Sequence, residues 1–481
     1  MSANSLKDEL SAGSGVVETL KNSPYRPMVF PVAAEFTNWR SEQHAWRDSV
    51  ALLDQSHHMT DLFISGPDAA AMLERLAVNT FKNFGVDKAK QMVSVNAEGK
   101  LIGDAILFHL GEDEYDLVGH PMLIDWVHFN AETGDWDVTI DRDPTSADRQ
   151  GPPKLYRYEI QGPNAVKVME KVTGQPVPDV KFFNMATFTI AGHEVKALKH
   201  GMAGQPGFEM FGPWAEGEDV LAALLEAGKE FDLKRAGAKA YSTANIESGW
   251  VPTPLPAIFT SEDTAAYREW VPFGRIGSLG GSFDAESIED YYLTPYDLGY
   301  ERNVKFDHDF IGREALEKIA EGPHRVKVTL VWNPEDVAGA FGTLMGEELP
   351  AKFIELPKSR YAHHQYDKVT VDGATVGVSL DCGYVANPQA YISLPSSTPN
   401  TRSRAPRSPS CGARTPTPTS RRSSPTVRSA SAPPWLRCPS TCTLARPTAH
   451  KEPPCSPIPQ TPPPRRSALQ TPPPRRAPSA G

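Results

Sequence analysis

The sequence predicts an α+β fold in which two similar α/β halves precede a separate β domain. The evidence for two halves is a repeated order of elements. Strand 61–65 is followed by Gly66-Pro67 and a helix over 69–77, and strand 155–161 is followed in the same way by Gly162-Pro163. A proline in the first helical turn, directly after a glycine, is typical of a strand-to-helix junction. The repeat therefore indicates two related units.

The evidence for a β domain lies after Arg325. Short apolar segments there alternate with turn residues, which is typical of strands, at 326–332, 369–371 and 376–378. We therefore expect four regions: an N-terminal extension over 1–34, a main domain over 35–320, a β domain over 321–394 and a tail over 395–481.

Hydrophobic periodicity predicts the remaining elements. Apolar residues near 3.6-residue spacing predict a helix from Phe36 to Leu53, which delivers the polar stretch Asp54–Thr60 to a helix-to-strand junction. Further expected elements are strands over 91–95, 102–110 and 115–119, a glycine-rich loop entering a short strand over 201–213, and a helix over 235–249.

Charge divides the 481-residue chain into two unlike parts. Residues 1–394 hold 35 basic and 58 acidic residues, a net charge of −23, whereas the tail holds 14 basic residues and a single acid, a net charge of +13. An acidic body repels phosphate backbones, so we expect no nucleic-acid partner for it. No run of 18 apolar residues and no signal peptide are seen, so we expect a cytoplasmic protein without a membrane span.

The tail has the composition of an unfolded segment. It contains 22 prolines and the near-repeat Thr-Pro-Pro-Pro-Arg-Arg at 461–466 and 471–476. Too little of it is apolar to form a core, so we expect it to be disordered. One interpretation is a linker or a proline-rich ligand. The other, which we favour, is a shifted reading frame, because GC-rich coding sequence read out of frame produces this bias.

Three polar features are candidates for a site. The stretch Asp54–Thr60 carries adjacent His57 and His58, one of which could equally cap the preceding helix. Asp104 interrupts an apolar run and is either a turn residue at a strand end or a site carboxylate. Glu209 follows a glycine-rich loop, where a lone carboxylate can accept hydrogen bonds from the N–H groups of a flat ring; a plain hairpin is the alternative.

A polar helix face adds a fourth candidate. Tyr241, Asn245 and Ser248 follow at i, i+4 and i+7 in the expected helix, and such a face on a buried helix usually lines a cavity. The residues before 395 contain neither His-Glu-x-x-His nor Cys-x-x-Cys, so we expect no metal site.

An ordered set of motifs resembles a known family. Gln161-Gly-Pro, Gly207-Phe-Glu209, Glu247-Ser-Gly249 and Asp309-Phe-Ile-Gly-Arg-Glu-Ala-Leu316 are similar to the motif series of the glycine-cleavage T-protein family, which uses tetrahydrofolate. Asp54-Gln-Ser-His-His-Met-Thr-Asp61 and His200-Gly-Met-Ala-Gly-Gln-Pro206 resemble the tetrahydrofolate-dependent O-demethylases within that family, which act on vanillate, syringate and 3-O-methylgallate. The resemblance extends over about residues 25–394.

The resemblance implies a fold and a reaction. The fold is two α/β halves and a C-terminal β-barrel-like domain around a central folate funnel. The reaction is methyl transfer from a lignin-derived aromatic methyl ether to tetrahydrofolate without a metal. The resemblance implies catalytic roles for Tyr241 and His58. It also implies that the cofactor is bound by Gln55, Asp104, Val118, Glu209 and Trp250. The substrate is expected to be bound by His57, His120, Phe30 and Met59.

Departures from the family pattern qualify these expectations. Aminomethyl-transferring members carry two aspartates where this chain has Gly103-Asp104, and an arginine near the place of Tyr241. His120 stands where the vanillate-type enzymes have an arginine that binds the substrate carboxylate, and Met28 and Phe30 stand where they have tyrosines. An imidazole holds a carboxylate less firmly than a bidentate guanidinium. The alternatives are a folate-dependent aminomethyltransferase or N- or S-demethylase, and a folate-binding protein without activity.

Overall fold

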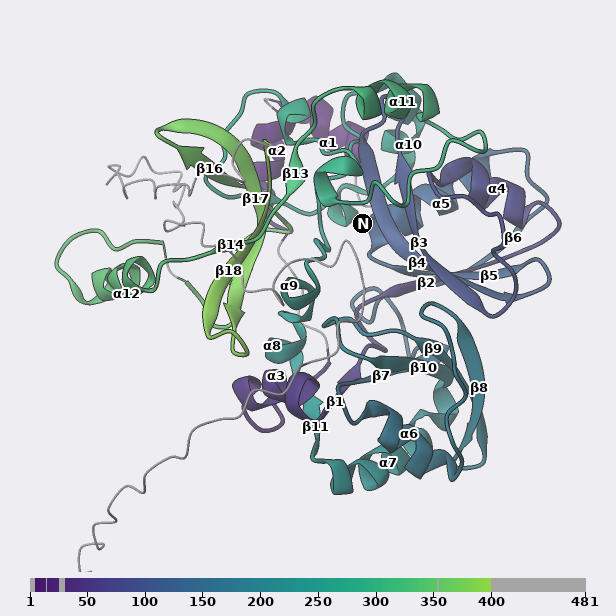
Figure 1. Ribbon diagram of the computed structural model, residues 1–481. Coiled ribbons are helices and arrows are strands. Elements are labelled where there is room, and N and C mark those ends of the chain that lie inside the picture. The colour runs from purple at the N-terminus through teal and green to yellow at the C-terminus, as the bar shows by residue number, and fades with distance from the viewer. Residues whose placement is uncertain (1–4, 14, 26–30, 353, 399–481) are drawn as a thin grey trace, which may run out of the picture. The chain divides into compact units, whose positions relative to one another are not determined.

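The computed structural model describes residues 5–13, 15–25, 31–352 and 354–398 of the chain (Figure 1). The tail over 399–481 and the predicted substrate residue Phe30 lie outside the described residues. Within the described ranges no helix is both long and apolar enough to cross a membrane.

The first half is one mixed unit of sheet and helices. Its sheet has the strand order β3-β4-β5-β2-β6, and every neighbouring pair is antiparallel. Helix α5 packs against β4 and β2, and α4 contacts α5 (Figure 1). The elements are β2 (Thr60–Ser65), α4 (Ala69–Leu76), β3 (Lys88–Val95), β4 (Leu101–Gly111), β5 (Glu114–Gly119), α5 (Pro121–Thr133) and β6 (Thr139–Asp143).

The second half repeats this chain order. Its elements are β7 (Leu155–Gln161), α6 (Ala165–Thr173), β8 (Met185–Ile190), β9 (His193–Lys199), β10 (Gly207–Pro213), α7 (Gly217–Gly228) and β11 (Leu233–Ala236). The sheet order is β8-β9-β10-β7-β1-β11, so β1 (Val50–Asp54) occupies the place beside β7 that β6 occupies beside β2. The two-halves prediction is confirmed, with one inserted strand.

The repeated Gly-Pro turns have nearly the same backbone. Gly66 has φ 128° and Gly162 has φ 134°, in the left-handed region that favours glycine. A Cβ on Gly66 would lie 2.5 Å from the carbonyl oxygen of Asp137, and one on Gly162 would lie 2.6 Å from that of Ser49. Each turn thus packs against the strand or loop beside it, which explains why both halves retain glycine there.

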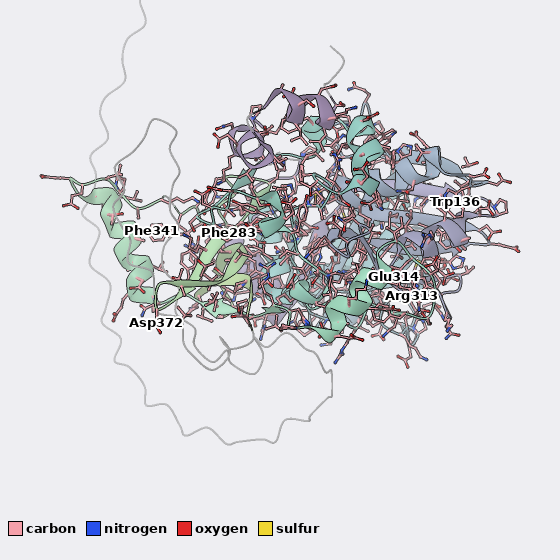
Figure 2. All side chains as sticks on the ribbon, turned by 90° about the horizontal axis from the view of Figure 1, so that it is seen from above. Trp136, Phe283, Arg313, Glu314, Phe341 and Asp372 are labelled. Carbon is pink, nitrogen blue, oxygen red and sulfur yellow. The ribbon has the colours of Figure 1, made fainter. Side chains whose placement is uncertain are left out.

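The C-terminal domain is an open sheet in the part of the chain that the structure describes. β18 (Ala390–Ser397) pairs with β13 (Val326–Lys327), β14 (Leu330–Val331) and β17 (Ala374–Val385), and β17 pairs with β16 (Asp367–Val371). Helix α12 (Pro334–Gly342) packs on this sheet through a small apolar cluster that includes Phe341 (Figure 2). The expected β domain is present, but no closed barrel forms among the described strands, and β18 extends three residues past the predicted end of the domain at 394.

Two predicted helices are wrong in part. The segment over 36–53 is helical only in α3 (Trp39–Asp48), because its last residues form β1, where the apolar run Val50-Ala-Leu-Leu53 is buried in the sheet. The stretch Asp54–Thr60 is therefore a strand-to-strand connection. The predicted helix over 235–249 starts later, because its first two residues belong to β11 (Leu233–Ala236), and residues 242–243 divide it into α8 (Ala238–Tyr241) and α9 (Ala244–Ser248).

Several short elements complete the fold. The predicted N-terminal extension holds α1 (Leu6–Ala12) and α2 (Val16–Asn22), whose Leu6 and Leu20 are fully buried in the main core. The others are α10 (Ala265–Trp270), β12 (Leu279–Gly280), α11 (Arg313–Glu321), β15 (His364–Gln365) and 3-10 turns at Trp214–Glu216, Lys229–Phe231, Glu262–Thr264, Phe273–Arg275, Ile288–Tyr291, Tyr296–Leu298 and Thr343–Met345.

A buried ion pair fastens the C-terminal domain to α9. Lys358 Nζ donates to Asp381 Oδ2 of β17 at 2.6 Å and to Asn245 Oδ1 of α9 at 3.1 Å. Asn245 Nδ2 also donates to Asp381 Oδ2 at 2.8 Å. Because all three residues are buried, their polar atoms depend on one another for hydrogen bonds.

We predict that Asp381→Ala destabilises the protein by about 3–5 kcal/mol, because it leaves Lys358 buried without a counter-charge. Urea unfolding measures the loss. The matched control is Glu230→Ala, which removes a surface pair with Lys171 whose side chains are 52% and 60% exposed, and which should change stability by less than about 1 kcal/mol. Equal effects of the two substitutions would contradict the prediction.

Candidate functional site

The connection between β1 and β2 crosses from the sheet of the second half to that of the first. This connection comprises residues 55–59, and hydrogen bonds to β7 hold its first two residues in place. Gln55 N donates to the carbonyl oxygen of Arg157 at 2.8 Å, and Arg157 N donates to Ser56 Oγ at 2.9 Å. The polar stretch singled out in the sequence therefore lies where the two halves meet.

A single guanidinium joins the two halves. Arg157 of β7 donates to Glu209 of β10 at 2.9 Å, to Asp61 of β2 at 2.6 Å and to Asp116 of β5 at 3.2 Å. Arg157 is 2% exposed, so these contacts form away from solvent. Burial, reinforced by the charge of Asp61, raises the pKa of Asp116 well above its ordinary value. Glu209, expected to be a lone carboxylate, is instead one partner in this cluster.

A further buried carboxylate lies on the same strand as Arg157. Glu159 is fully buried, accepts from Gln55 Nε2 at 2.5 Å and accepts from Met202 N at 2.7 Å. Burial raises the Glu159 pKa, and the charge of Glu209 adds to this effect. Among the described residues, Gln55 Oε1 and Gln161 Nε2 are buried without a hydrogen-bond partner. Gln55 and Gln161 therefore leave one buried acceptor and one buried donor available for further hydrogen bonds.

Tyr241 and His58 are in direct contact. The phenol oxygen lies 2.8 Å from His58 Nε2, and the rings meet edge to face at 4.8 Å between centroids. Burial, and then the charges of Glu159 and Glu209, raise the Tyr241 pKa well above 10. Burial, with the charge of Arg360, lowers the pKa of the partly exposed His58 to about 3. At neutral pH both partners are therefore uncharged, and the phenol keeps its proton.

His57 faces away from this pair. Its Nδ1 lies 3.0 Å from Ser146 Oγ, its Nε2 lies 3.9 Å from Asp54 Oδ2, and its ring packs near Trp214. Met59 and Val118 both belong to a small apolar cluster that contains Phe108 of β4 and Phe211 of β10. The structure thus brings His58, but not His57, to Tyr241.

Asp104 lies within β4 and is not a turn residue at a strand end. Its Oδ2 accepts from Trp250 Nε1 at 2.8 Å and from Gln91 Nε2 at 2.7 Å. Burial raises the Asp104 pKa to about 6, and these two hydrogen bonds limit the rise. Trp250 connects this group to α9, because Trp250 N donates to the carbonyl oxygen of Asn245 at 2.9 Å and Asn245 Nδ2 donates to that of Trp250 at 2.8 Å. Two predicted cofactor residues are therefore in contact.

His120 immediately follows β5 and occupies the N-cap position of α5, where its side chain makes no capping hydrogen bond. Burial lowers its pKa to about 3, with contributions from the charges of His364, His363 and Arg360, so its imidazole is neutral at neutral pH. Among the described residues, its Nδ1 is buried without a hydrogen-bond partner. Met28 and Phe30, which stand where the vanillate-type enzymes have tyrosines, lie outside the described residues.

Sequence reasoning missed Arg157, Glu159 and Gln161. They alternate along β7 with Tyr158 and Ile160, so their side chains share one face of a strand that is buried on both sides. A strand with three polar residues at alternate positions signals a polar interior, and this pattern was visible in the sequence. The C-terminal residues Lys358 and Arg360 had no comparable signal, because only tertiary contacts bring them to α8 and α9.

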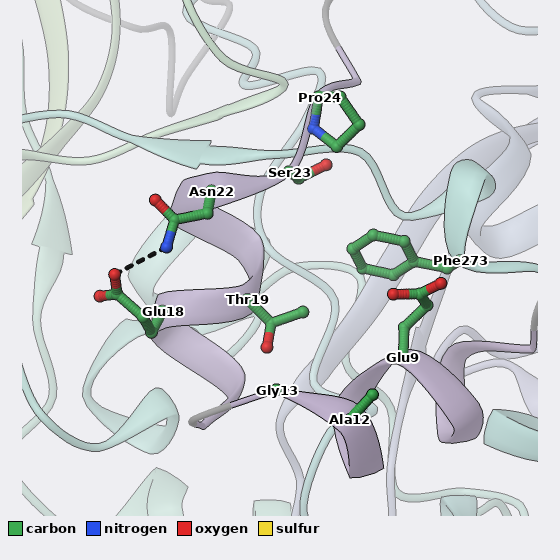
Figure 3. A pocket seen from close by; sticks show the side chains of 9 residues that line it. All are labelled: Glu9, Ala12, Gly13, Glu18, Thr19, Asn22, Ser23, Pro24 and Phe273. Atoms are coloured by element: carbon green, nitrogen blue, oxygen red, sulfur yellow. Dashed lines mark hydrogen bonds between the residues drawn. The ribbon is translucent and has the colours of Figure 1, made fainter. Parts of the chain in front are cut away.

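A separate surface pocket lies at the N-terminal helices (Figure 3). It is lined by residues of α1 and α2 together with Phe273, and Asn22 donates to Glu18 at 2.6 Å across its edge. None of the predicted site residues lines it. In the described part of the chain, no three His, Cys, Asp or Glu side chains are grouped as metal ligands.

The fold and these motifs are those of the glycine-cleavage T-protein family. The family model "GCVT N-terminal domain" matches residues 8–253, and the chain belongs to this family. A crystal structure of the glycine cleavage system aminomethyltransferase T from Bartonella henselae has the same fold, with a TM-score of 0.55 at 15% identity over 85% of this chain and 91% of that chain.

Relatives point to a particular branch of the family. The chain is 48% identical to the syringate O-demethylase of a Sphingobium species over 397 residues, which is 82% of this chain and 86% of the relative. It is 29% identical to the sesamin methylene transferase of a Sinomonas species, over 66% of this chain and 71% of the relative. An aminomethyltransferase of Streptomyces avermitilis is 27% identical over 74% of this chain and 88% of the relative.

The raised pKa of Asp104 predicts a pH-dependent stability difference for Asp104→Asn. In the folded protein the pKa of this carboxyl is about 6, above its ordinary value of 3.8, so proton binding favours folding at low pH and this contribution is lost as pH rises through 6. Asparagine keeps a side-chain oxygen that can accept from Trp250 and Gln91. Because asparagine does not titrate, its contribution to stability does not fall as pH rises. The variant should therefore gain on the order of 2–3 kcal/mol relative to wild type between about pH 4 and pH 7.5.

Urea unfolding at the two pH values measures this gain. The control is Asp290→Asn, which replaces an exposed carboxylate and should show the same difference from wild type at both pH values. A difference for Asp104→Asn that does not grow with pH would show that the Asp104 carboxyl is not destabilised in its charged form.

Proposed function

We propose that this protein is a tetrahydrofolate-dependent O-demethylase that transfers a methyl group from a methoxylated aromatic acid to tetrahydrofolate. The observation that carries the proposal is the neutral Tyr241–His58 pair, with a 2.8 Å contact, beside a buried set of carboxylates and amides. The 48% identity to a syringate O-demethylase over most of both chains supports the same activity.

Ether cleavage requires a proton donor. An aryl methyl ether is inert until its oxygen can leave as a phenol, so a positioned acid must supply a proton. The raised pKa of Tyr241 keeps its hydroxyl protonated over the whole physiological range. We assign this hydroxyl as the acid that protonates the departing oxygen.

His58 orients this acid. A neutral imidazole can donate through Nε2 to the Tyr241 oxygen and leave the phenol O–H directed at the substrate, or it can accept that proton. The lowered pKa of His58 excludes an imidazolium at neutral pH, so His58 does not itself compete as a charged donor. Its role here is to hold the tyrosine ring and its hydroxyl in place.

The buried polar groups fit a reduced pterin. The amino group and ring N–H of a pterin need acceptors, and the carboxylates of Glu209 and Glu159 together with the unpartnered Gln55 Oε1 supply them. Asp104, held by Trp250, is a further acceptor. Bound tetrahydrofolate supplies the nucleophilic N5 that accepts the methyl group. The protein's part is to align donor and acceptor, since in-line displacement requires three atoms on one axis.

A panel of methyl donors tests the proposal. Purified protein incubated with tetrahydrofolate should form 5-methyltetrahydrofolate with vanillate, syringate or 3-O-methylgallate, and the demethylated phenol should appear in equal amount. Methylation of folate by dimethylglycine instead would support an aminomethyltransferase or N-demethylase. Folate binding without turnover of any donor would identify a binding protein and overturn the proposal.

We predict that Tyr241→Phe lowers kcat by about 100-fold or more, the range expected for loss of a general acid, while tetrahydrofolate affinity changes by less than about threefold. Steady-state kinetics and folate titration measure the two quantities. The matched control is Tyr115→Phe, which removes a buried phenol hydroxyl on β5 and should leave kcat near wild type. Equal losses of turnover and affinity would contradict the role of Tyr241 as acid.

A further inference from the structure

The segment over 357–365 of the C-terminal domain, here named the strap, runs beside the helix that carries Tyr241. Its first end is fixed by Lys358, whose Nζ donates to the carbonyl oxygen of Ser242, the residue after Tyr241, at 3.1 Å. The carbonyl oxygen of Pro357 accepts from Tyr384 N of β17 at 2.7 Å. The start of the strap is therefore held against the end of the helix that presents Tyr241.

The second end of the strap is fixed as firmly. Thr253 Oγ1 donates to the carbonyl oxygen of His363 at 2.9 Å, and His364 N donates to that of Ser278 at 2.9 Å. The buried His364 ring lies between the carbonyl oxygens of Thr253 and Ile276, at 3.1 and 2.8 Å from its nitrogens. Arg360 lies between two anchored ends, so the backbone that carries it is held in place.

Arg360 differs from the other charged groups of this region. Its side chain is exposed, and no carboxylate among the described residues pairs with it. Its positive charge nevertheless adds to the lowering of the pKa of His58 and His120 by burial, and it limits the rise in the pKa of Tyr241. Because both imidazoles are neutral at neutral pH, they offer no positive charge to an anion, whereas Arg360 does.

His120 supplies a second reason to expect an anion here. Its Nδ1 is buried without a hydrogen-bond partner among the described residues. Unpaired buried polar atoms are costly, and a ligand oxygen is one way to satisfy such an atom. A guanidinium can hold a carboxylate through two parallel hydrogen bonds, which a neutral imidazole cannot do.

We propose that Arg360, assisted by His120, binds the carboxylate of the aromatic methyl donor. This inference rests on the proposed methyl transfer and adds the residue that selects acids among methoxyarenes. The positive charge that is absent from position 120 is then supplied by the C-terminal domain. The carboxylates of the folate glutamate have the same chemistry, so the test must separate the two sources.

The test compares one arene with and without its carboxylate. Syringate and 2,6-dimethoxyphenol share the methoxy groups and the phenol, and only syringate carries the acid. Arg360→Ala should raise KM for syringate by about 10- to 100-fold, the usual range for a charge-assisted hydrogen-bonded pair, and change kcat little. KM for 2,6-dimethoxyphenol and for tetrahydrofolate should change by less than about threefold.

Two further variants sharpen the result. Arg360→Lys keeps the charge but loses the paired hydrogen bonds, so its KM for syringate should lie between wild type and Arg360→Ala. Lys368→Ala removes another exposed cation of the same domain, on β16, and should behave as wild type. Equal losses with both arenes, an unchanged KM for syringate, or a raised KM for tetrahydrofolate alone would overturn the assignment.

Equilibrium binding keeps this inference separate from the proposed activity. If wild type turns over no methoxyarene, the methyl transfer proposal fails, but titration of wild type and Arg360→Ala with syringate still decides the role of Arg360. At least tenfold weaker binding to the variant supports the assignment. Equal binding to both proteins, or no binding to wild type, overturns it.

Discussion

The arrangement of the site depends on one buried guanidinium. Arg157 extends from the second half to Asp61 and Asp116 of the first, and to Glu209 of its own sheet. One cation among three carboxylates, with Glu159 on the same strand, leaves an excess of acid in a dry region. Burial, and then the charge of Asp61, raise the pKa of Asp116, and protonation of Asp116 relieves part of that excess. Removal of Arg157 would leave these carboxylates buried without a counter-charge.

The inserted strand explains why the candidate residues gather there. β1 belongs to the sheet of the second half, although it precedes the first half in the chain, so the connection to β2 must cross between the sheets. Gln55 and His58 lie on this crossing, and β7 fixes its start through Ser56. A pair of α/β repeats joined end to end would have no such crossing. Because β1 is inserted into the sheet of the second half, the loop residues that follow it lie between two rigid sheets. Loops held by a rigid scaffold in this way often carry function.

The sequence predicted the fold better than it predicted the contacts of the site. Gly66-Pro67 and Gly162-Pro163 revealed the two halves, because only a restricted backbone geometry suits such turns. The helix over 36–53 was wrong at its end, since an apolar run fits a buried strand as well as a helix. Asp104 and Trp250 were both expected at the cofactor, but their mutual hydrogen bond was not foreseen. Lys358 and Arg360 could not be foreseen, because their place follows only from how the C-terminal domain packs.

The electrostatics of the Tyr241–His58 pair raise a question about the proposed acid, since a tyrosine with a raised pKa donates its proton less readily. An ordinary phenol and tyrosine have similar pKa values, near 10. A phenolate leaving group formed beside Tyr241 would experience the same burial and the same charges of Glu159 and Glu209, so its pKa would rise as well. The proton transfer then remains nearly balanced, because the surroundings shift donor and acceptor together. A group that lowered the pKa of the departing phenol alone would oppose the transfer, and the neutral His58 adds no positive charge that would do so.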